Sequence, residues 1–192
     1  MIKQKRLVLL VEGEGDRTAA PVLVKRVLTD LNAWDCLTLD NKPPMIVGEI
    51  GGLIKNKGEK WKKYLEAARR TRPNLGAVLL LLDGDPEKIL GQNFCARDVA
   101  RYLAGLARDA GAEKLFSVAV VFACQEFESW ILTCADRIAG LNLADGRPGV
   151  RAETIRPQQD LEKRPRNAKG LLGEKMEFGY NPVRDQGPAL SI

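Results

Sequence analysis

Three short apolar runs in this sequence each lead into carboxylate side chains, and this repetition limits the folds open to the chain. The runs span residues 7–11, 77–82 and 116–123. Helices are predicted after and between them at residues 19–31, 51–72, 98–110 and 126–138. The first run has no polar alternation, which is typical of a strand buried on both faces. Alternating strands and helices favour an α/β fold class with a mostly parallel central sheet flanked by helices.

The carboxylates that follow these runs should share one edge of the sheet, because parallel strands end on the same side and ligands bind there. The acids concerned are Glu12, Asp16, Asp83, Asp85, Glu126 and Glu128. Converging like charges are costly without a cation. Mg²⁺ prefers oxygen ligands, so we predict that all six hold a divalent metal. Taken singly, Asp16 as a helix N-cap and Asp83 and Asp85 as turn residues are the more ordinary interpretation.

The residue types exclude several classes of site. The chain has no histidine, and its four cysteines show no C-x-x-C spacing. The lack of histidine excludes Ser-His-Asp and Cys-His nucleophilic sites and zinc sites with imidazole ligands. General acid–base chemistry is left to carboxylates, lysine, tyrosine or metal-bound water. Scattered cysteines indicate reduced thiols, and no apolar run reaches the ~18 residues of a membrane helix, so we expect a soluble, cytoplasmic protein.

Positive charge is concentrated toward the end of the chain. The 192 residues include 30 Lys and Arg against 25 Asp and Glu, a formal net charge of +5. Large apolar residues are few after residue 140. We therefore predict an α/β domain at residues 1–140 and a basic, loosely folded extension at residues 141–192. A positive field beside an acidic cluster suits a polyanion when a metal ion lies between them.

A second basic region is the helix predicted at residues 51–72, in which Trp61, Leu65 and Ala68 recur at helical spacing. We expect five lysines on its outer face to contact a nucleic-acid backbone. These are Lys55, Lys57, Lys60, Lys62 and Lys63. A solvated surface helix without a partner is an equally weighted alternative, because charge runs usually indicate only that.

Three motifs carry a family resemblance. They are VEGEGD at residues 11–16, LDGD at residues 82–85 and QEFESWIL at residues 125–132. Their order and spacing resemble those of the DUF4276 proteins, which are similar to the Toprim domains of topoisomerases, primases and OLD-family nucleases. The resemblance implies a Toprim-like fold and a Mg²⁺-dependent phosphoryl-transfer site.

The resemblance also implies roles for individual acids. The family's strand-end glutamate, its DxD pair and the two acids before its tryptophan correspond to Glu12, Asp83, Asp85, Glu126 and Glu128. Asp16 stands where relatives often have glutamate. The expected catalytic residues are Glu12, Asp83 and Asp85, and the expected cofactor is Mg²⁺ or Mn²⁺.

The expected function is therefore a Mg²⁺-dependent nuclease that hydrolyses phosphodiester bonds of DNA or RNA in a defence or mobile-element system. Two alternatives from other classes stay open. One is a non-catalytic Toprim-like module that regulates or docks onto a partner ATPase. The other is a small-molecule phosphotransferase.

Overall fold

The central sheet is parallel and has five strands. The computed structural model describes residues 4–84, 86, 88–89, 91–123, 126–151 and 167–192. Within them the strand order is β2-β1-β4-β7, and β3 pairs with β1 beyond the end of β2. The strands are β1 (Lys5–Val11), β2 (Leu37–Leu39), β3 (Met45–Ile46), β4 (Leu75–Asp83) and β7 (Ser117–Ala123). The predicted α/β class with a mostly parallel central sheet is confirmed.

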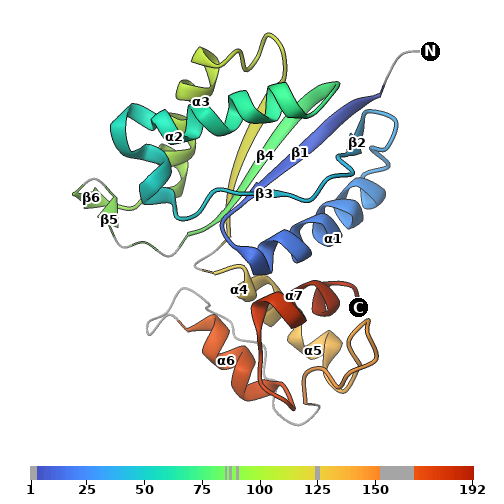
Figure 1. The fold of residues 1–192 in the computed structure, drawn as a ribbon. Helices are drawn as coiled ribbons and strands as arrows, with labels where there is room; N and C mark the ends of the chain where they lie inside the picture. Colours follow the sequence, from blue (N-terminus) through green and yellow to red (C-terminus); the bar gives the residue numbers. More distant parts are fainter. Residues whose placement is uncertain (1–3, 85, 87, 90, 124–125, 152–166) are drawn as a thin grey trace.

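Helices cover both faces of this sheet, as Figure 1 shows. One face packs against α2 (Ile50–Thr71) and α3 (Ala96–Asp109), and the other packs against α1 (Glu14–Asp30). Side chains of β1 alternate between the two apolar clusters. Val8 and Leu10 face the α2 side, whereas Leu7, Leu9 and Val11 face α1. This alternation places β1 in the middle of the core, since successive strand residues point to opposite faces.

Helix α2 is interrupted, although the sequence predicted one continuous helix. Residues 55–58 leave helical geometry, and Asn56, Lys57 and Gly58 have positive φ angles. Only Gly58 adopts such an angle without strain, and its Cα lies against Leu106 of α3, where a Cβ would clash. The close contact between α2 and α3 thus accompanies the break. Lys55 and Lys57 are exposed to solvent at this break in the helix.

A layer of short helices lies beyond the carboxyl ends of the strands (Figure 1). It contains α4 (Glu128–Thr133), α5 (Ala135–Ile138), α6 (Ala168–Lys175) and α7 (Pro182–Leu190). The single helix predicted at residues 126–138 is therefore wrong, because the chain breaks at Cys134 between α4 and α5. Helices from both sides of residue 140 share one buried cluster that includes Ile131, Leu172 and Met176. The boundary at residue 140 stays a prediction.

The helical layer contacts the α/β layer through a close approach of α7 to the start of α1. A Cβ at Gly15 would lie 2.5 Å from Gln186 Oε1 and 2.7 Å from Pro182 Cβ. Neither contact leaves room for a side chain, so glycine is required here. The carboxyl ends of β4 and β7 also approach closely, since a Cβ at Gly84 would lie 2.5 Å from the carbonyl oxygen of Ala123.

A small antiparallel hairpin, β5 (Lys88–Ile89) and β6 (Gln92–Asn93), follows β4. In the described part of the chain, no helix has the length and apolar character needed to cross a membrane.

Candidate functional site

Backbone hydrogen bonds connect the three strand ends that the sequence singled out. The N–H of Asp83 at the end of β4 donates to Glu12 Oε2 at 3.1 Å. Asp83 Oδ1 in turn accepts the N–H of Phe127, after β7, at 2.9 Å. Glu12 and Asp83 therefore lie side by side at one edge of the sheet. Their positions follow from the register in which Val11 pairs with Leu81.

Asp16 joins this edge from the first turn of α1. The sequence predicted it as the helix N-cap, but the N-cap is Gly13, and Asp16 is the third helical residue. Its Oδ2 accepts the N–H of Gly13 at 3.0 Å, and its Oδ1 accepts Gln186 Nε2 at 3.3 Å. Burial raises the pKa of Asp16, while the bonds from Gly13 and Gln186 and the charge of Lys169 oppose that rise.

Asp83 has the most perturbed carboxyl group of the edge. Its pKa is raised to about 8, first by burial and then by the negative charges of Asp16, Glu12 and Glu128. The N–H of Phe127 opposes the shift without cancelling it. A carboxylate among other carboxylates favours its ionised form only when a cation is added. The electrostatics of Asp83 therefore suit an external positive charge.

Glu126 and Glu128 are held by a lysine from the helical layer. The backbone N–H of Lys169 donates to Glu126 Oε2 at 2.9 Å, and its Nζ lies 3.7 Å from Glu128 Oε1. Burial raises the pKa of Glu128, and the charge of Lys169 opposes the rise. Burial lowers the pKa of Lys169, but Glu128, Glu126, Asp83 and Asp16 together outweigh burial and raise it. Lys169 is thus a cation inside the acidic cluster.

Three buried polar atoms of the helical layer lack a hydrogen-bond partner among the described residues. They are Ser129 Oγ, Tyr180 Oη and Gln186 Oε1. Burial raises the pKa of Tyr180, and the charge of Glu128 adds to it. The hydroxyl is therefore close to that carboxylate. Unpaired buried polar groups cost free energy, so these atoms mark places where a bound ligand or ion would add bonds.

The family comparison covers this whole arrangement. Residues 11–188 match the family model described as a domain of unknown function, DUF4276. The chain belongs to the DUF4276 family. No curated protein and no solved structure matches it.

The match confirms the predicted resemblance to DUF4276 proteins, and its span includes the helical layer. The similarity to Toprim domains stays a prediction. Sequence reasoning named the acids of this layer but missed Lys169, Tyr180 and Gln186. No signal pointed to them, because they lie at least 41 residues beyond Glu128 in a segment that was interpreted as a basic extension. Only the packing of α6 and α7 brings them to the acids.

Five of the six predicted metal ligands of this DUF4276 protein are described by the structure, and they lie at one edge without all converging. Asp85 lies outside the described residues. Among the described residues, no group of three or more acidic or cysteine side chains is close enough to hold a metal ion. The donor chemistry still fits, because the oxygens of Glu12, Asp16 and Asp83 are the type that Mg²⁺ and Mn²⁺ prefer. The carboxylates at this edge therefore match a divalent cation in their charge and in their donor atoms.

The predicted nucleic-acid-binding lysines lie on α2, over the opposite face of the sheet from α1. Three of them have internal partners. Lys60 Nζ donates to the Val47 carbonyl at 2.7 Å, Lys62 Nζ lies 2.8 Å from Asp109 Oδ2, and Lys63 Nζ lies 2.6 Å from Glu59 Oε1. Lys55 and Lys57 are exposed at the break in α2. Nucleic-acid contact by these five lysines stays a prediction.

Proposed function

We propose that this DUF4276 protein is a Toprim-like, Mg²⁺-dependent nuclease that hydrolyses phosphodiester bonds of DNA or RNA, in a defence or mobile-element system. The observation that carries the proposal is the linkage of Glu12, Asp83 and Phe127 at one sheet edge. It gathers the acids of three separate strands. The raised pKa of Asp83 supports a cation at that edge.

Glu12, Asp83 and Asp85 would hold the first Mg²⁺ or Mn²⁺ ion, with Asp16, Glu126 and Glu128 as further ligands. When bound, the metal would activate water and neutralise the charge that develops on the phosphate. The Phe127 N–H orients Asp83 through Oδ1, and the Gly13 N–H orients Asp16 through Oδ2. These bonds fix the carboxylates before any ion arrives, which reduces the reorganisation that binding requires.

Glu12 would act either as a metal ligand or as the general acid–base at the scissile phosphate, since the chain contains no histidine. The Asp83 N–H fixes its Oε2. Lys169 would offset part of the negative charge that repels an incoming phosphate, because its Nζ lies among the carboxylates. The helical layer thus contributes positive charge to a site whose acids come mainly from the strand ends.

The test is cleavage of plasmid DNA and of a structured RNA with Mg²⁺ or Mn²⁺, comparing wild-type protein with Asp83→Asn. Asn preserves the shape of the side chain but not its charge. Cleavage should fall by about 100-fold, which corresponds to about 2.7 kcal/mol of activation free energy.

The matched control is Asp98→Asn, because Asp98 is an exposed carboxylate at the start of α3 and lies outside the acidic edge. It should cleave as wild type does. Equal cleavage by wild type and Asp83→Asn would contradict the proposal. Absence of cleavage by wild type under every condition would favour the non-catalytic module or the phosphotransferase.

A further inference from the structure

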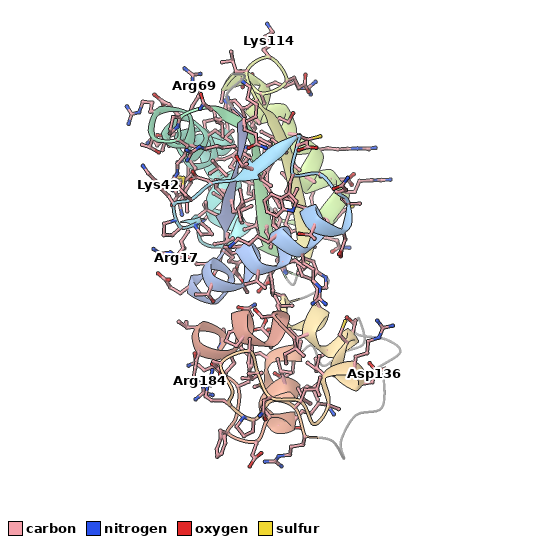
Figure 2. The ribbon with its side chains drawn as sticks, turned by 90° about the vertical axis from the view of Figure 1, so that its right-hand side faces the viewer. Arg17, Lys42, Arg69, Lys114, Asp136 and Arg184 are labelled. Carbon is pink, nitrogen blue, oxygen red and sulfur yellow. The ribbon has the colours of Figure 1, made fainter. Side chains whose placement is uncertain are left out.

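A groove runs along α1 on the face of the sheet opposite to α2. Its volume is about 660 Å³, and its walls are one side of α1 and the connection between β2 and β3. Three cationic side chains line it: Arg17 and Lys25 from α1, and Lys42 from the connection. Figure 2 shows Arg17 and Lys42 on the same edge of the α/β layer.

The acids in the groove do not cancel this charge. Asp40 is only 4% exposed and is neutralised by Arg6 at 3.0 Å and Arg72 at 3.1 Å. Glu14 is the remaining carboxylate, paired with Arg17 at 3.2 Å on the surface of α1. Such exposed pairs contribute little, so Arg17 can exchange Glu14 for another anion at small cost.

The two lysines are available to a ligand. Lys25 is exposed, and its amine makes no hydrogen bond or ion pair with the described residues. Lys42 is exposed as well, and its Nζ donates only to the carbonyl oxygen of Thr71, at 3.2 Å. On α2, Lys60 Nζ donates to the Val47 carbonyl, and Lys62 and Lys63 form exposed ion pairs with Asp109 and Glu59.

The groove begins at the first turn of α1, next to the acidic edge along the chain, because Glu14 and Arg17 line it. Helix α1 starts at Glu14, two residues after Glu12, and its first turn carries Asp16, with Arg17 next in the sequence. Lys25 lies eight residues further on, or about 12 Å along the helix axis. That length matches about three to four nucleotides of one duplex strand, which rises 3.4 Å per nucleotide. Positive charge therefore follows α1 from Lys25 to Arg17, the residue after Asp16 in the sequence.

We infer that this groove binds the phosphate backbone of a nucleic-acid strand and directs it to the acidic edge. Arg17, Lys25 and Lys42 are the phosphate contacts. The inference rests on the proposed function, whose substrate is nucleic acid. It assigns the substrate path to the α1 face and not to the α2 face.

The test measures binding separately from cleavage. Fluorescence anisotropy of a labelled DNA duplex and of a labelled single-stranded RNA is recorded in EDTA, over a range of salt concentrations. The variants are Lys25→Gln/Lys42→Gln, and the matched pair Lys62→Gln/Lys63→Gln on α2, which removes the same charge. The groove variant should bind about tenfold more weakly, and its salt dependence should fall by about two in slope, one for each lost phosphate contact.

The other possible outcomes distinguish failure of the groove assignment from failure of the proposed function. Weakened binding by the α2 variant with unchanged binding by the groove variant would overturn the groove assignment and leave the proposed function intact. An equal loss of affinity in both variants would also overturn the groove assignment, because binding would then depend on total positive charge and not on the groove. No binding of either probe by wild-type protein would contradict the proposed function, and the groove assignment with it. Tighter binding of one probe shows whether DNA or RNA is the source of the backbone.

Discussion

Two aspartates, one in each layer of the molecule, have opposite surroundings. Asp185 in α7 is fully buried and accepts from Arg147 and Arg184, each at 2.6 Å, and from the N–H of Asn181 at 2.8 Å. Burial alone would raise its pKa, but the bonds from these groups outweigh burial and lower it. Asp83 is surrounded by other carboxylates, and its pKa is raised to about 8.

The difference separates a carboxylate that is neutralised by arginines of the same chain from one that lies among other carboxylates. Asp185 is paired with Arg147 and Arg184 of the same chain, and its bond with Arg147 links α7 to the segment around that residue. Asp83 forms no such ion pair with an arginine or lysine among the described residues, and Lys169 is paired with Glu128. An external cation would stabilise a carboxylate without a counter-ion more than one that is already paired. Strongly shifted pKa values such as that of Asp83 are concentrated at functional sites.

The largest expected effect is on the pH dependence of stability. The raised pKa of Asp83 stabilises the folded protein below about pH 4, and that stabilisation is lost as pH rises toward 8. The lowered pKa of Asp185 has the opposite effect: its stabilisation is present at neutral pH and is lost in acid. In metal-free protein at pH 8, Asp83→Asn should therefore raise the free energy of unfolding. Asp185→Asn should lower it by about 2 kcal/mol, a reduced value because the arginines are partly exposed.

Chemical denaturation from pH 4 to pH 9 in EDTA measures both effects. At pH 8 in EDTA, the free energy of unfolding should be higher than that of wild type for Asp83→Asn and lower for Asp185→Asn. In a parallel series with Mg²⁺ in place of EDTA, the ion should stabilise wild type more than Asp83→Asn. Loss of stability in both variants at pH 8 would remove the distinction between the two aspartates.

The next largest effect concerns the junction of the two layers. Gly15→Val should lower the free energy of unfolding by about 1.5 kcal/mol, because its side chain would overlap Gln186 and Pro182 of α7. Gly51→Ala is the control, since a Cβ there meets nothing within 4 Å. It should leave thermal unfolding unchanged or raise the midpoint slightly. If Gly15→Val had the same free energy of unfolding as wild type, the close contact of α1 with α7 would not contribute to stability.

A smaller effect tests the internal cation. Lys169→Met should slow cleavage about tenfold, or about 1.4 kcal/mol, because Glu126 and Glu128 lose the charge that offsets them. The acidic limb of the pH–rate profile should move to higher pH, since Lys169 lowers the pKa of Glu128. Lys169→Arg should restore most of the rate and the profile. An unchanged profile in Lys169→Met would show that the lysine has no influence on the acids.

The smallest effect concerns the unpaired hydroxyl of Tyr180. Tyr180→Phe removes a buried polar group that has no hydrogen-bond partner among the described residues. Metal-free protein should gain about 1 kcal/mol in the free energy of unfolding. Tyr102→Phe is the control, because Tyr102 is 42% exposed and should give no change. Destabilisation by Tyr180→Phe would indicate a bond that this hydroxyl makes in solution.

The strand-end acids were predictable because their signal is local. An apolar run followed directly by an acid predicts both a buried strand and the position of its last charge, as for Val11 and Glu12. The helix breaks were not predictable in this way. The interruption of α2 depends on the contact of Gly58 with Leu106, and the turn at Cys134 depends on packing within the helical layer. Both involve partners that are distant in the sequence.

The sequence by itself determined the α/β class, the family and the acids of the sheet edge, because each follows from residues that are neighbours along the chain. Only the tertiary structure decided that Lys169, Tyr180 and Gln186 meet those acids, and that Arg17, Lys25 and Lys42 share a groove. The physical reason is that a charge acts across space and not along the chain. The strand ends concentrate negative charge, and the fold decides which distant groups lie near enough to balance it.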